Sequence, residues 1–110
     1  MGTTTTTIST DQPLTTLVNV FTVAPEAQQS LVDLLVTATE DVMAHRPGFR
    51  LGNIHASLDG ARVTYNAQWR TEEDFKTTLS DPDAREHFTS VNTIASAEPH
   101  LYRVESVHHS

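Results

Sequence analysis

The stretch FRLGNIHASLDGARVTYNAQW, residues 49–69, decides the fold because it has the pattern of two strands joined by a tight turn. Residues 49–58 and 61–69 have strand character, and Asp59-Gly60 lies between them. An Asp-Gly pair between two such runs is a strong hairpin signal, since both central residues of a type I′ turn need positive φ. The stretch therefore predicts an antiparallel hairpin with a two-residue type I′ turn.

The residues before the hairpin predict one strand and one long helix. TLVNVFTV, residues 16–23, is short, β-branched and apolar on both faces, which favours a strand that is covered on both sides. Residues 25–46 predict a helix, with Pro25 in its first turn and Pro47-Gly48 after its end. Its apolar residues follow the spacing of a buried stripe and are Leu31, Leu34, Leu35, Ala38 and Val42.

The residues after the hairpin complete a recognisable order of elements. Residues 71–79 predict a helix in which Thr71 and Asp74 form a variant of the capping box. Residues 82–95 predict a further helical stretch, and residues 100–107 a last strand. The order is β-α-β-β-α-β, which predicts a ferredoxin-like α+β fold with an antiparallel sheet.

Length and composition set the limits for function. The chain has 110 residues, enough for a single domain over residues 14–110, preceded by a Thr-rich tail, residues 1–13, that we expect to be disordered. A net charge of −7 disfavours nucleic acid and anionic membranes as partners. The absence of cysteine excludes disulfides and thiolate metal sites. No apolar run approaches the roughly 18 residues of a membrane span. We expect a soluble cytoplasmic protein.

The predicted sheet has two faces, and the helices can cover only one of them. We expect the other face, with Leu or Phe, Asn, Tyr and Trp side chains, to form an apolar patch that a second copy of the chain covers. This predicts a homodimer, a dimeric α+β barrel. The space between sheet and helices in each subunit is then a natural pocket for a small molecule.

Two residues of the predicted strands are candidates for chemistry. Asn19 sits between Leu17 and Phe21 on an apolar face, where a buried amide must be hydrogen-bonded. It either bonds a neighbouring backbone group or points into a pocket and orients a ligand oxygen. Trp69, the only tryptophan, is either a core aromatic or an aromatic platform whose indole N–H donates to a ligand.

Three further polar residues have both a functional and a plain interpretation. His55 is either a general base or a solvent-facing histidine. Arg85 either pairs with a phenolate oxygen or forms a surface salt bridge, and His87 lies close to it in the sequence. The six histidines of the chain do not have the spacing of a metal site, so no metal is expected.

Several short motifs carry a resemblance to a known family. They are LVNVFTV, RPGF, HASLDG, NAQW followed by TEEDF, and the closing HLYRVESV. On these motifs, residues 16 to 107 resemble the antibiotic biosynthesis monooxygenase family, small dimeric α+β-barrel proteins. Within it the chain is similar to the cofactor-independent anthrone-type oxygenases of aromatic polyketide pathways. The resemblance implies that Asn19 and Trp69 are the functional pair.

The chain also departs from the family pattern. Members often carry an Asn four residues before the Trp, where this chain has Tyr65, with Asn66 next to it. A shift by one residue moves a strand side chain to the other face of the sheet. Some members carry a Tyr in the following helix, where this chain has Phe75. The haem-degrading members are matched at Asn19 and His87, but Thr78 stands at their Trp position, so haem degradation is less favoured.

The resemblance implies a cofactor-independent monooxygenase that uses O₂ to oxidise a polycyclic, anthrone-like polyketide intermediate to a quinone. Alternatives on the same scaffold are a polyketide cyclase or isomerase, and a non-catalytic protein that binds a small aromatic ligand. The predicted catalytic residues are Asn19, Trp69 and His55. The predicted substrate-binding residues are Phe21, Tyr65, Phe75, Arg85 and His87.

Overall fold

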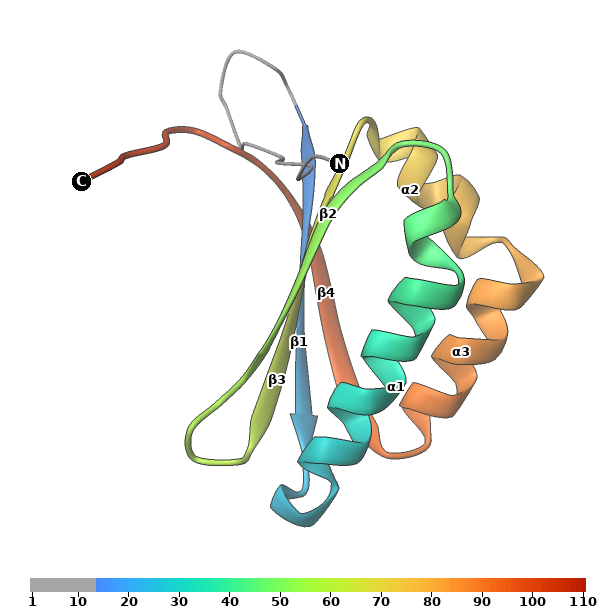
Figure 1. The fold of residues 1–110 in the computed structure, drawn as a ribbon, viewed down its shortest axis with the longest axis vertical. Helices are drawn as coiled ribbons and strands as arrows, with labels where there is room; N and C mark the ends of the chain where they lie inside the picture. Colours follow the sequence, from blue (N-terminus) through green and yellow to red (C-terminus); the bar gives the residue numbers. More distant parts are fainter. Residues whose placement is uncertain (1–13) are drawn as a thin grey trace, which may run out of the picture.

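The computed structural model describes residues 14–110, which form one antiparallel four-stranded sheet with helices packed against one face (Figure 1). The strand order β2-β3-β1-β4 and the element order confirm the predicted ferredoxin-like α+β fold. The disordered tail predicted for residues 1–13 lies outside the described residues. The elements are β1 (Thr15–Val23), α1 (Gln28–Asp41), β2 (Phe49–Ala56), β3 (Arg62–Trp69), α2 (Glu72–Leu79), α3 (Pro82–Asn92) and β4 (Ala95–Arg103).

The large apolar side chains of the sheet face the helices. Leu17 and Phe21 of β1 and Tyr65 and Trp69 of β3 are all buried in the core. The prediction that such side chains lie on the face away from the helices is wrong. Because side chains alternate along a strand, one face receives this whole set, and the helices pack on that face. The open face carries the intervening residues, which are shorter or polar.

The predicted long helix over residues 25–46 is divided into three pieces. A 3₁₀ turn, η1 (Pro25–Ala27), precedes α1, and a second one, η2 (Met43–His45), follows it. Val42 leaves the helical conformation, with φ −125° and ψ −64°. The predicted stripe is nevertheless correct, since Leu31, Leu35, Ala38 and Val42 are buried and Leu34 packs against the core.

The β2–β3 hairpin is confirmed, but its turn is not type I′. The loop runs over residues 57–61, and the Gly60 N–H donates to the Ser57 carbonyl at 3.1 Å. Gly60 has φ +81°, whereas Asp59 has a negative φ. The Asp59 carboxylate instead accepts hydrogen bonds from the Ser57 hydroxyl and the Ala61 N–H, which stabilise the wider turn.

The last helix is shorter than predicted, and the last strand lies earlier in the chain. α3 ends at Asn92, where the Thr93 hydroxyl donates to the Ser90 carbonyl at 2.6 Å. β4 begins at Ala95, which pairs with Val23, rather than at residue 100. Residues 95–98 have weak strand propensity, so their pairing with β1 and not their own preference sets the conformation.

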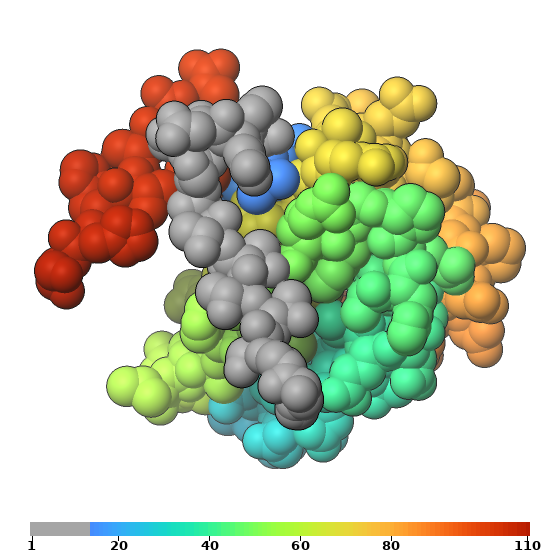
Figure 2. Space-filling model, turned by 45° about the horizontal axis from the view of Figure 1, so that its top comes forward, coloured from blue at the N-terminus to red at the C-terminus, as the bar shows by residue number. Residues whose placement is uncertain are grey.

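The helix starts and the chain end complete the description. The Thr71 hydroxyl caps α2 by accepting the Asp74 N–H at 3.0 Å, as predicted. Asp81 caps α3 and also forms an ion pair with Arg46 at 2.7 Å. The residues after β4 leave on the side of the sheet opposite the helices (Figure 1), and Figure 2 shows them projecting from the body. Over residues 14–110, no helix has the length and apolar character needed to cross a membrane.

Candidate functional site

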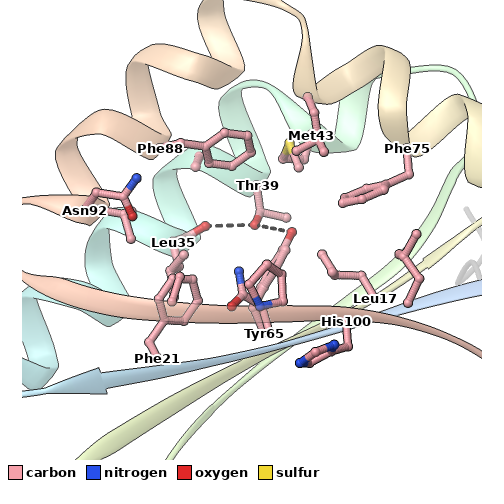
Figure 3. Close-up of a pocket in the computed structure, with 17 residues that line it drawn as sticks. Leu17, Phe21, Leu35, Thr39, Met43, Tyr65, Phe75, Phe88, Asn92 and His100 are labelled. Carbon is pink, nitrogen blue, oxygen red and sulfur yellow. Dashed lines mark hydrogen bonds between the residues drawn. The ribbon is translucent and has the colours of Figure 1, made fainter.

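A cavity of about 350 Å³ lies between the sheet and the helices (Figure 3). This volume is at the lower end of the range of roughly 300–1,000 Å³ found for small-molecule sites. Most of the wall is apolar. The sheet contributes Leu17, Asn19, Phe21 and Tyr65, and the helices contribute Leu35, Thr39, Met43, Phe75 and Phe88.

The mouth of the cavity lies at the edge strand β4. The exposed residues of its lining come from β4 and from the C-terminal ends of α2 and α3, and they are Leu79, Asn92, Ala97, Pro99, His100 and Leu101. Leu17, Phe21, Leu35 and Tyr65 are buried deeper in the wall. The cavity therefore opens between β4 and the two later helices and has its buried floor on β1 and β3.

Asn19 lies in this wall, and its side-chain oxygen has no hydrogen-bond partner within residues 14–110. It pairs across the sheet with Tyr65 of β3 on one side and with Pro99 of β4 on the other. Its Oδ1 atom is buried and makes no hydrogen bond among the described residues. Leaving a buried acceptor unpaired costs about 1–3 kcal/mol. Of the two interpretations, the geometry favours an amide that awaits a ligand over one that bonds the backbone.

Tyr65 is held in place by a short hydrogen-bond chain. Its hydroxyl lies 2.8 Å from the Thr39 hydroxyl, which lies 2.8 Å from the Leu35 carbonyl oxygen (Figure 3). Burial raises the pKa of Tyr65 above its usual value of 10.0, an effect only partly offset by the hydrogen bond with Thr39. Tyr65 is therefore a neutral phenol at physiological pH.

Trp69 lies behind the cavity wall and does not line the cavity. It is fully buried, with its ring edge-on to Phe49 at 5.4 Å and to Phe75 at 5.8 Å between centroids. Its Nε1 atom is buried without a partner among the described residues. Because Phe75 lines the cavity and contacts Trp69, Trp69 positions the wall from behind.

The structure does not bring His55, Arg85 or His87 to the cavity. His55 pairs with Thr64 on the open face, where its Nδ1 lies 3.4 Å from the Asn66 amide nitrogen. Arg85 is exposed on α3, and His87 lines a separate shallow groove between α1 and α3. Side chains alternate between the two faces along a strand. Ile54 lies on the same face as Tyr65, so the next residue, His55, lies on the open face.

The sequence interpretation missed several cavity residues, among them Phe88 and Thr39. Phe88 lines the cavity from α3, although its place in an apolar helical stripe predicts only that it is buried. Thr39 follows the buried Ala38 and carries no signal of its own, since its role depends on Tyr65, which is 26 residues away in the sequence. His100 also lines the cavity, but its ring lies on the other side of the strand (Figure 3). Within residues 14–110, no cluster of three or more His, Cys, Asp or Glu side chains could hold a metal ion.

The fold and the site together define a class of protein. It is a ferredoxin-like domain with an apolar cavity between its sheet and helices, and the wall of that cavity includes the amide of Asn19. Residues 15–90 match the antibiotic biosynthesis monooxygenase family. The chain belongs to this family, and it is an oxidoreductase of the monooxygenase type.

The relatives agree with this assignment. The chain is 46% identical over 93 residues to the tetracenomycin-F1 monooxygenase of Streptomyces glaucescens, covering 84% of this chain and 83% of that protein. SnoaB, a cofactor-independent oxygenase from Streptomyces nogalater, has a similar structure, with TM-score 0.72, 24% identity and 86% and 95% coverage of the two chains. The ActVA-Orf6 monooxygenase of Streptomyces coelicolor, solved with nanaomycin D, gives TM-score 0.73, 24% identity, and 90% and 96% coverage.

Proposed function

We propose that this protein is a cofactor-independent monooxygenase that oxidises a polycyclic, anthrone-like polyketide intermediate to a quinone with O₂. The observation that carries the proposal is Asn19, whose buried Oδ1 has no partner among the described residues, in the wall of an apolar, aromatic-walled cavity of about 350 Å³. The 46% identity to a tetracenomycin-F1 monooxygenase supports a polyketide as substrate.

The chemistry needs little from the protein because the substrate supplies the electrons. An anthrone carries an acidic CH₂ group opposite its ring carbonyl, and loss of one proton gives a delocalised enolate. The enolate passes one electron to O₂, and the resulting radical pair combines to a C–O bond. Protonation gives a hydroperoxide, and loss of water leaves a second carbonyl. The balance is R₂CH₂ + O₂ → R₂C=O + H₂O, with one oxygen atom in the product.

Asn19 stabilises the charge that develops on the substrate oxygen. Its amide nitrogen donates a hydrogen bond to the enolate oxygen, and its unpaired Oδ1 accepts one from a hydroxyl group of the substrate. In an apolar cavity such bonds have a larger effect than in solution. Phe21 and Phe75 hold the ring from the sheet side and from the helix side. Trp69 keeps Phe75 in place by their edge-on contact.

The substrate proton leaves to water at the mouth of the cavity. His55 is on the far side of the sheet, too remote to take a proton from a ligand in the cavity. Tyr65 lines the cavity, but its raised pKa keeps it protonated, so it cannot serve as a base at neutral pH. We therefore expect ionisation of the substrate to depend on the substrate's own acidity.

The test is oxygen uptake by the purified protein with a hydroxylated anthrone, in the presence of a chelator. We expect one O₂ consumed per quinone formed, and a rate at least about tenfold lower in Asn19→Ala. The matched control is His55→Gln, which lies outside the cavity and should stay within about twofold of the wild type. A wild-type rate equal to the uncatalysed background would overturn the proposal for this substrate class.

The same experiment separates the alternative functions. A polyketide cyclase or isomerase would convert its substrate at the same rate without oxygen, since it uses the cavity and Asn19 without a redox step. A binding protein would retain the ligand unchanged. These two alternative functions are considered because none of the described lining residues offers a general base that faces the cavity.

We also propose that two copies pair through the open face of the sheet. This face carries Val18 and Val20 of β1, which are only partly buried, and the half-exposed Tyr102 of β4. The residues after β4 leave the body on the same side and include Val107 (Figure 1). A partner on this face would cover these side chains and leave the cavity open, because the cavity lies on the other side of the sheet, against the helices.

A further inference from the structure

The hydrogen-bond chain behind Tyr65 fixes the direction of its hydroxyl proton. The Leu35 carbonyl oxygen can only accept, so the 2.8 Å contact with the Thr39 hydroxyl uses the one proton that Thr39 has. The 2.8 Å contact between Thr39 and Tyr65 then needs a proton from Tyr65. Tyr65 therefore donates to Thr39, and Thr39 donates to Leu35 (Figure 3).

This direction decides what Tyr65 offers to a ligand. Its raised pKa keeps the hydroxyl neutral, so it has one proton, and that proton points away from any ligand. Tyr65 lines the cavity and is only 6% exposed. The oxygen therefore presents lone pairs to the cavity, and it behaves as an acceptor where a tyrosine usually has the choice of donating.

We propose that Tyr65 selects a ligand with a protonated hydroxyl group, a phenol or enol, at this point of the cavity. A carbonyl oxygen there would meet another lone pair, and a methoxy group would bring no proton. This inference rests on the proposed function only for the fused-ring nature of the ligand, and it adds a specificity determinant to it.

The neighbour of Tyr65 on β1 strengthens the argument. Asn19 pairs directly with Tyr65, so the two polar side chains lie side by side on one face of the sheet. The Asn19 Oδ1 atom is also a buried acceptor without a donor. Pro99, on the other side of Asn19, has no N–H that could satisfy it. This part of the wall therefore has two oxygen acceptors that no described residue supplies with a proton.

The test compares 2-hydroxyanthraquinone with 2-methoxyanthraquinone, in which a methyl group replaces this proton; Tyr65→Phe separates the lost hydrogen bond from the added bulk. Binding is measured by isothermal titration calorimetry in a buffer that keeps the ligand hydroxyl protonated. We expect the wild type to bind the hydroxy compound about tenfold more tightly. Tyr65→Phe should remove this preference. Thr39→Val should also reduce it at least about fivefold, because the freed Tyr65 proton can then turn toward the ligand.

The control is Thr39→Ser, which keeps the hydroxyl and both hydrogen bonds and should keep the preference. A preference unchanged in both Tyr65→Phe and Thr39→Val would overturn the inference, as would binding of neither compound to the wild type. Oxygen uptake is scored separately. A protein that selects the hydroxy compound but consumes no O₂ keeps this inference and loses the proposed function. A protein that consumes O₂ with a hydroxylated anthrone but shows no preference between the two anthraquinones keeps the proposed function and loses this inference.

Discussion

The side-chain oxygen of Asn19 has no hydrogen-bond donor in the part of the chain that the structure describes. On one side Tyr65 has given its proton to Thr39, and on the other side Pro99 has no amide proton. A buried amide in this position lowers the stability of the ligand-free fold. Its retention in an apolar wall is therefore best explained by a ligand that completes its hydrogen bonds.

We predict that Asn19→Leu makes the fold more stable while it removes activity. The substitution replaces an unpaired polar group by an apolar one of similar volume and should raise the free energy of unfolding by about 1 kcal/mol. Urea denaturation measures the gain, and oxygen uptake measures the loss. A variant that is less stable than the wild type would show that Asn19 is hydrogen-bonded in the native protein.

Tyr65 provides a prediction on alkaline stability. Its pKa is raised in the folded state, so its contribution to stability is complete below the unfolded value of about 10 and is lost as the pH rises through the folded pKa. Tyr65→Phe cannot ionise and should lose less stability above about pH 10 than the wild type does. Thermal melts of both proteins at neutral and alkaline pH make the comparison. Parallel losses in the two proteins would contradict a raised pKa at Tyr65.

At the scale of elements, Asp81 joins two parts of the chain. It caps α3 through the Ala84 N–H at 3.2 Å and binds Arg46, which precedes β2, at 2.7 Å. We predict that Asp81→Ala lowers the free energy of unfolding by about 2 kcal/mol. Thr71→Ala, which removes a cap alone, should cost about 1 kcal/mol. Urea denaturation of both variants tests the difference, and equal losses would mean that the ion pair contributes nothing.

The elements with a strong local signal were predictable, and those set by pairing were not. The hairpin, the stripe of α1 and the Thr71 cap follow from local chemistry and are confirmed. The early start of β4 depends on the register with β1, which residues 95–98 do not encode by themselves. The type of the hairpin turn failed because the Asp59 side chain bonds within the loop, so that only Gly60 takes a positive φ.

The candidate site was predicted in part for the same reason. Asn19, Phe21, Tyr65 and Phe75 were predicted as site residues and line the cavity. Strand parity groups the three strand residues on one face, but the prediction of which face the helices cover was wrong. His55 was chosen for its chemistry, although its parity places it on the other face. The alternation of side chains along the strand would have excluded His55 from the cavity on sequence evidence alone. Thr39 could not have been found in this way, since only the packing of α1 on β3 shows its contact with Tyr65.

At the scale of the whole molecule, the open sheet face predicts the state of assembly. We expect light scattering to give a mass twice that of the chain. Tyr102→Glu, on this face, should shift the protein toward the monomer because it would bury a charge in the contact. The matched control is Leu58→Glu, at the fully exposed tip of the hairpin, which should remain a dimer. A monomeric wild type at high concentration would contradict the pairing.

The position of Trp69 has a practical consequence. The chain has one tryptophan, and it is sealed from water in contact with Phe75, a residue of the cavity wall. Its fluorescence should therefore be blue-shifted, and it should change when a ring system displaces Phe75 or quenches the indole. Optical screening of unlabelled compound libraries against the native protein then becomes possible before any reaction is known.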